Sequence, residues 1–127
     1  MHYADDILVI DDDQPILEMI TEVLTEEGYI VRTSLSPREA RVAIAERCPS
    51  LVLCDIHLPE ETGVMLVNSL KASALADVPV VFITADMRAV RELSKDSSTL
   101  YLLKPFDIDQ LIDWVAQHLC RDRVAAT

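Results

Sequence analysis

Hydrophobic and polar positions follow one another along the chain in a pattern that predicts alternating strands and helices. Four short, mostly aliphatic runs each end at a polar or charged residue: residues 7–10 before Asp11, 51–54 before Asp55, 80–83 before Thr84 and 100–103 before Lys104. Runs of this length, rich in β-branched residues and separated by helical patterns, are typical of buried parallel strands. Because ligands bind beyond the carboxyl ends of the strands in open α/β sheets, we expect these polar residues to meet at one edge.

The segments between these runs carry helix start and stop signals. Pro15 lies in the first turn of a helix that stops at Gly28, and a further strand is expected at 29–33. Ser36-Pro37-Arg38-Glu39 is a capping box that opens a helix to about Arg47. Three more helices are expected: from the loop at 58–63 to about Ala74, a short and weaker one at 87–95, and one that begins after Asp107 and carries Leu111, Ile112, Val115 and Leu119 on one face.

Five strands alternating with five helices predict an α/β fold with a doubly wound, five-stranded parallel sheet and helices on both faces. The expected strand order is 2-1-3-4-5, the flavodoxin-like order. We expect one domain over residues 1–127, with a core from about 6 to 120. This order makes the first and third strands neighbours, so that residues 11–13 lie beside Asp55.

Composition narrows the class of protein. The net charge of −11 and the pI near 4.5 argue against direct binding to nucleic acid or to an anionic membrane. The chain has no apolar run near the ~18 residues that span a bilayer and no signal-peptide pattern at its start, so we expect a soluble, cytoplasmic protein. The chain has three cysteines, Cys48, Cys54 and Cys120. Their odd number and their lack of metal-site spacing indicate reduced thiols, with Cys54 in the core.

The crowded carboxylates at the predicted edge favour a divalent cation. Close carboxylates repel one another, and a bound Mg²⁺ removes that penalty because it prefers hard oxygen ligands. Asp12 and Asp55 are the best direct ligands, and Asp11 would bind directly or through a water. Asp13 is read as a helix-start residue, where a carboxylate complements the helix dipole.

The same edge suits a phosphoryl group. Asp55 stands alone after the central strand, and a carboxylate held there can attack phosphorus to give an aspartyl phosphate. Lys104 supplies a compact positive charge, and Thr84 supplies a hydrogen-bond donor for phosphoryl oxygens. Pro105 would shape the following loop, and a cis bond before it is an option.

With these residues in place, the chain resembles the receiver domain of two-component response regulators. The resemblance runs from Ile7 to Leu119 and rests on Ile7-Leu8-Val9-Ile10-Asp11-Asp12-Asp13, on Asp55-Ile56-His57-Leu58-Pro59 with Gly63, on Thr84-Ala85 and on Lys104-Pro105-Phe106.

The resemblance implies a role for each of these positions. Asp55 would be the phosphoacceptor, supplied by a histidine kinase or a histidine phosphotransfer protein. Asp11, Asp12 and Asp55, with the backbone carbonyl of His57, would hold Mg²⁺. Thr84 would be the switch hydroxyl, Lys104 the lysine that contacts phosphate, and Tyr101 the switch aromatic. The domain would promote its own phosphorylation and dephosphorylation and signal to a downstream protein or an output domain.

The stretch between Thr84 and Lys104 departs from the family pattern. It is about two residues shorter than usual, and residues 95–99 stand where the family has Gly-Ala before the last strand. We therefore expect a truncated or irregular fourth helix, and the usual output and dimerisation face is not predicted. His57 and Asp86 each lie two residues after a site residue, where they would influence access of the hydrolytic water and thus the lifetime of the phosphoryl group.

Three alternatives remain open from the sequence. A Mg²⁺-dependent phosphohydrolase with an aspartyl intermediate would need an acid/base carboxylate where His57 stands. A flavin-binding module would need a glycine- and hydroxyl-rich loop where the three acidic residues stand. A pseudo-receiver that only binds partners would not need the full set of acid, hydroxyl and lysine. A stand-alone regulator and a piece of a larger regulator or hybrid kinase are both compatible with the sequence.

Overall fold

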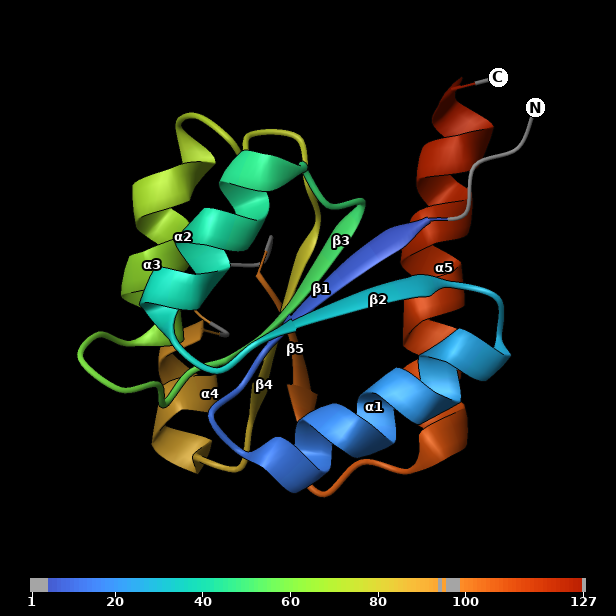
Figure 1. The fold of residues 1–127 in the computed structure, drawn as a ribbon. Coiled ribbons are helices and arrows are strands. Elements are labelled where there is room, and N and C mark those ends of the chain that lie inside the picture. Colours follow the sequence, from blue (N-terminus) through green and yellow to red (C-terminus); the bar gives the residue numbers. More distant parts are fainter. Residues whose placement is uncertain (1–4, 94, 96–98, 127) are drawn as a thin grey trace.

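The computed structural model describes residues 5–93, 95 and 99–126, with side chains as far as Leu119. It is a five-stranded parallel sheet between two layers of helices, with strand order β2-β1-β3-β4-β5 (Figure 1). The predicted fold class and strand order are confirmed. In chain order the elements are β1 (Asp6–Ile10), α1 (Gln14–Glu26), β2 (Ile30–Ser34), α2 (Pro37–Glu46), β3 (Leu51–Asp55), α3 (Gly63–Lys71), β4 (Val80–Thr84), α4 (Met87–Leu93), β5 (Leu100–Leu103) and α5 (Ile108–Ala126).

The central strands are apolar on both faces because each face is covered by helices. In β1, Ile7 and Val9 pack in the core formed with α1 and α5, whereas Leu8 and Ile10 pack in the core formed with α2, α3 and α4. Figure 1 shows the same division, with α1 and α5 on one side of the sheet and the other three helices on the opposite side. This two-sided burial explains why the strand sequences show continuous rather than alternating hydrophobicity.

Side-chain caps are present at the beginnings of α1, α2 and α3; those at Asp13 and Ser36 were predicted from the sequence, and the one at Thr62 was not. The side chains of Asp13, Ser36 and Thr62 each accept a hydrogen bond from a backbone amide in the first turn, at 3.4, 3.2 and 3.1 Å. At the other end of α1, Gly28 has a φ of 95°, a conformation that glycine adopts at little cost. The three caps therefore lie at the carboxyl edge of the sheet, whereas Gly28 lies at the opposite, amino edge, just before β2.

Several predicted boundaries were wrong by one to three residues. The second strand begins at Ile30 and not at Tyr29, because the Tyr29 amide donates to the Leu24 carbonyl and closes the last turn of α1. The third helix ends at Lys71 and not near Ala74, because the Leu75 amide donates to the Leu70 carbonyl in a tight turn. The fourth helix ends at Leu93, two residues before the predicted end. No helix in the described ranges combines the length and apolar character needed to cross a membrane.

Candidate functional site

Three carboxylates lie together at the carboxyl ends of β1 and β3. Asp55 is the last residue of β3, and Asp11 and Asp12 follow β1 directly. One oxygen from each of Asp11, Asp12 and Asp55 lies within 4.8 Å of the other two. Oxygens that share an octahedral Mg²⁺ lie at most about 4.2 Å apart, so small side-chain movements would let the three ligate one ion. Asp11 and Asp55 are buried and Asp12 is exposed, which leaves one open side for water or substrate.

Lys104 brings a positive charge into this cluster from the end of β5. Its Nζ lies 2.9 Å from Asp11 Oδ2 and 3.7 Å from Asp55 Oδ2. The Lys104 amide donates to the Thr84 carbonyl, which fixes the lysine backbone beside the end of β4. The Lys104–Pro105 bond is cis, the option that the sequence left open.

Burial and the neighbouring charges set the protonation of Asp55. Burial, followed by the charge of Asp11, raises the pKa of Asp55 from 3.8 to about 6, while Lys104 and the backbone amides of His57 and Ile56 act in the opposite direction. A carboxylate with a raised pKa is more basic than an ordinary one, so it is a stronger nucleophile when ionised. A cation bound beside it would favour the ionised form.

The loop between β3 and α3 folds back tightly onto Asp55. The Gly63 amide donates to the Ile56 carbonyl at 2.7 Å, and a Cβ placed on Gly63 would overlap the Asp55 backbone oxygen and lie 2.9 Å from Cys54 Sγ. Arg41 of α2 forms an ion pair with Glu61 of the same loop and donates to Ser69 of α3. Gly63 was named from the sequence only as part of the family resemblance, and no structural role was predicted for it. Its position as one of two glycines in the chain is the signal that would have indicated a close backbone approach.

Thr84 closes the edge on the β4 side. Its side chain is fully buried, and its Oγ1 accepts the Asp86 amide at 2.9 Å. The Asp86 carboxylate accepts from the amides of Arg88 and Ala89 at the start of α4, and its other oxygen lies 2.8 Å from His57 Nε2. The hydrogen bond from His57, and next the amide of Arg88, lowers the pKa of Asp86. The two residues that the sequence singled out separately therefore contact each other.

Tyr101 is placed apart from the carboxylate cluster. It lies in the middle of β5, is half-buried and packs against the core on the α2, α3 and α4 side. This position fits both the switch aromatic of the resemblance and an ordinary strand tyrosine. Much of the unusual segment at 95–99, which the sequence places next to Tyr101, lies outside the described residues.

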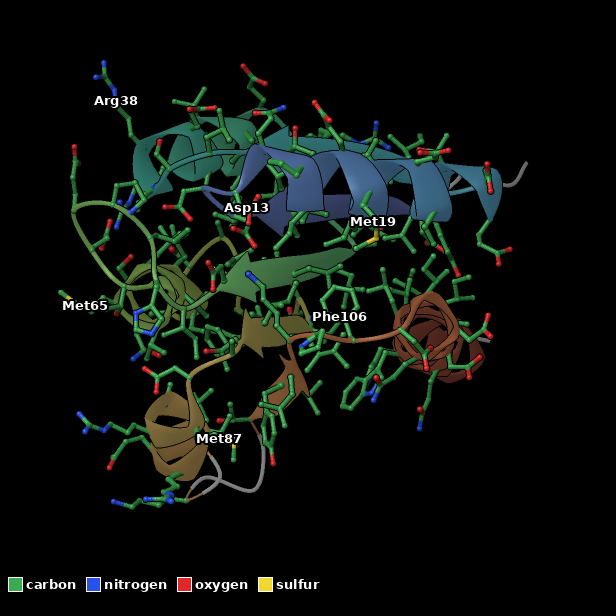
Figure 2. All side chains as sticks on the ribbon, turned by 90° about the horizontal axis from the view of Figure 1, so that it is seen from below. Asp13, Met19, Arg38, Met65, Met87 and Phe106 are labelled. Carbon is green, nitrogen blue, oxygen red and sulfur yellow. The ribbon has the colours of Figure 1, made fainter. Side chains whose placement is uncertain are left out.

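An apolar hollow of about 290 Å³ adjoins Lys104, between α1 and the loop that follows β5. Its lining includes Ile16, Met19, Pro105 and Phe106, and Figure 2 labels Met19 and Phe106 on its two sides. Further around the same edge, Figure 2 shows Met65 of α3 and Met87 of α4, which are 60% and 54% exposed. The polar site is thus bordered by apolar surface that a protein could contact.

Comparison with known proteins agrees with this geometry. Residues 7–116 match the family model "Response regulator receiver domain". The chain is 32% identical over 120 residues to the transcriptional regulatory protein ZraR of Salmonella typhimurium, covering 93% of this chain and 27% of that protein. It is 32% identical over 109 residues to the phosphate regulon transcriptional regulatory protein PhoB of Pseudomonas aeruginosa, covering 84% of this chain and 48% of that one.

The solved structures give the same result. The receiver domain of NtrX from Brucella abortus superposes with a TM-score of 0.80 at 31% identity, covering 90% of this chain and 98% of that one. This chain spans about a quarter of ZraR and about half of PhoB, so those relatives contain further sequence that has no counterpart in these 127 residues. From the family model, the relatives and the fold together, the chain belongs to the response regulator receiver domain family, a family of two-component signalling proteins.

Proposed function

We propose that this domain accepts a phosphoryl group from a phosphohistidine donor on Asp55, and that the modification changes how the domain contacts a partner. The observation that carries the proposal is that Asp11, Asp12 and Lys104 surround Asp55 at the end of β3. Asp55 is buried, and its pKa is raised to about 6. A phosphorylated carboxylate is the covalent intermediate that such a nucleophile gives.

The bond changes can be stated atom by atom. An ionised Asp55 Oδ attacks phosphorus in line with the departing imidazole nitrogen, so a P–O bond forms as the P–N bond breaks, and the donor leaves as a neutral histidine after gaining a proton. Mg²⁺ held by Asp11, Asp12, Asp55 and the His57 carbonyl would neutralise charge on the phosphoryl oxygens. Lys104 would bind one of these oxygens, and Thr84 would donate to another.

Reversal of the signal would use the same site. Attack by water on phosphorus returns the Asp55 carboxylate and inorganic phosphate, so the domain would promote its own dephosphorylation. Movement of Thr84 toward the phosphoryl group, with rotation of Tyr101, would alter the surface around α4, β5 and α5. That surface change is the proposed output.

The proposed chemistry also implies a phosphoryl donor and an output partner. The apolar hollow beside Lys104 supports contact with a histidine kinase or a histidine phosphotransfer protein that presents the phosphohistidine. Such a donor on the cytoplasmic side would place this domain in the cytoplasm. We further propose that residues 1–127 form one receiver domain, whose output passes to a separate protein or to an output domain of a longer chain.

The test is incubation with Mg²⁺ and phosphoramidate, a small donor with a P–N bond, followed by intact mass measurement. We expect one added phosphate, lost on Asp55→Asn and lost when Mg²⁺ is chelated. Absence of the adduct, together with absence of Mg²⁺ binding, would contradict the proposal. Steady turnover of a phosphate ester would instead support the phosphohydrolase alternative.

A further inference from the structure

Asp86 joins three elements that surround the phosphoacceptor. Its backbone amide donates to Thr84 Oγ1 at 2.9 Å, and its Oδ1 accepts the Arg88 amide at 2.9 Å in the first turn of α4. Its Oδ2 lies 2.8 Å from His57 Nε2, on the loop that follows Asp55. One residue therefore connects the end of β4, the start of α4 and the β3–α3 loop.

The contact with Thr84 determines where its hydroxyl oxygen lies. In this arrangement an oxygen lone pair of Thr84 is used within the β4–α4 turn, and the side chain is fully buried. For the hydroxyl to approach a phosphoryl group on Asp55, the Asp86 amide must be released or must move with it. The Asp86 carboxylate opposes that movement, because the Arg88 amide and the His57 ring hold it from two directions.

We propose that Asp86 is a positioning residue for Thr84, and that its hydrogen bond with His57 stabilises the unphosphorylated arrangement of the β4–α4 turn. The inference rests on the proposed function, because it assigns Thr84 the role of phosphate-contacting hydroxyl. It adds a specific consequence: loss of the His57–Asp86 contact makes the phosphorylated arrangement easier to reach.

The expected size of the effect follows from exposure. The side chains of His57 and Asp86 are 64% and 34% exposed, and exposed ion pairs contribute about 0.2–1 kcal/mol. If the contact exists only in the unphosphorylated arrangement, its removal should tighten binding of a phosphoryl mimic by about 1.4- to five-fold. General damage to the site would weaken binding, so the direction of the change separates positioning from a merely structural role.

The first experiment uses the protein without any phosphoryl group. Amide hydrogen exchange is compared between wild type, His57→Ala, Asp86→Ala and Asp86→Asn, with Glu92→Gln as the matched control. Glu92 forms an exposed ion pair with Lys95, which lies just beyond the end of α4, at 3.1 Å. We expect faster exchange at the Asp86 and Arg88 amides in His57→Ala and Asp86→Ala. Asn retains a cap oxygen, so Asp86→Asn should restore much of the protection. Unchanged exchange in His57→Ala would overturn the proposal.

The second experiment titrates beryllofluoride, a phosphoryl mimic, in the presence of saturating Mg²⁺. We expect about 1.4- to five-fold tighter binding for His57→Ala and Asp86→Ala, an intermediate value for Asp86→Asn and no change for Glu92→Gln. Equal or weaker binding in both alanine variants would overturn the proposal while leaving the proposed function standing. Failure of wild type to bind the mimic, with the exchange results as expected, would instead count against the proposed function on which the inference rests.

Discussion

Lys104 Nζ lies 2.9 Å from Asp11 Oδ2, across 93 residues of sequence. The Asp11 side chain is fully buried and that of Lys104 is 18% exposed, so this ion pair compensates a carboxylate that water cannot reach. The pair also holds the lysine 3.7 Å from the Asp55 carboxylate, within reach of a phosphoryl oxygen placed there. The contact therefore serves both the stability of the edge and the proposed chemistry.

Lys104→Met should destabilise the metal-free protein by about 2–4 kcal/mol, because it leaves Asp11 buried without its countercharge. Mg²⁺ should recover part of this loss by supplying positive charge to the same carboxylates. Urea unfolding with and without Mg²⁺ measures both effects. Lys95→Met is the control, since its exposed pair with Glu92 should contribute under about 1 kcal/mol. Equal destabilisation by the two substitutions would contradict the assigned role of Lys104.

Asp55→Asn should stabilise the metal-free protein at neutral pH. The folded-state pKa of Asp55, about 6, lies above its ordinary value of 3.8, so the folded protein binds this proton more tightly than the unfolded chain does. The stability that results is fully present below about pH 3.8 and is lost as the pH rises through about 6. The ionised group then destabilises the fold by about 1–3 kcal/mol, a penalty that asparagine removes.

Unfolding of wild type and Asp55→Asn at pH 5 and at pH 7.5 tests this sign. The advantage of the asparagine variant should be larger at pH 7.5 and smaller at pH 5, and saturating Mg²⁺ should reduce it for wild type. A variant that is less stable than wild type at pH 7.5 without metal would show that the charge of Asp55 is already compensated by Lys104.

Gly63→Ala should impair both folding and phosphorylation. The added Cβ would overlap the Asp55 backbone oxygen, and backbone cannot yield as a flexible side chain can. We expect a loss of about 2–4 kcal/mol in stability and slower formation of the phosphoryl adduct, because Asp55 itself must shift. Gly28→Ala is the comparison: nothing lies within 4 Å of its added Cβ, so only the cost of a φ of 95° remains, about 1 kcal/mol. If both variants phosphorylate at the wild-type rate, Gly63 does not position Asp55.

The sequence could predict the sheet and the carboxylate cluster because both depend on strong local signals. Four apolar runs that each end at a polar residue determine which side chains reach the edge, and the strand order then makes Asp11 and Asp55 neighbours. Element boundaries were less predictable. The start of β2 depends on the hydrogen bond from the Tyr29 amide to the Leu24 carbonyl, which hydrophobic periodicity does not encode.

Contacts between the loops could not be predicted from the sequence. His57 and Asp86 are 29 residues apart, and each was identified only by its distance from a site residue. Their hydrogen bond depends on the conformations of two loops at once. The overlap that makes Gly63 necessary likewise depends on how closely the β3–α3 loop returns to β3. Side-chain pairing between loops is set by tertiary structure rather than by local pattern.

His57→Ala and Asp86→Ala should both shorten the lifetime of the phosphoryl group on Asp55, by about two- to ten-fold. The two side chains stand on the loops that flank Asp55, so cutting either one back to alanine should open space for the hydrolytic water, an effect of about 0.5–1.5 kcal/mol on the barrier. The same substitutions should also let Thr84 contact the phosphoryl group more closely. That contact would be made equally in the ground state and in the transition state of hydrolysis, so it should leave the rate of dephosphorylation unaltered. The decay of the adduct by intact mass after removal of the donor gives the rate, with Glu92→Gln as the control. Dephosphorylation at the wild-type rate in both alanine variants would show that neither side chain governs access of water.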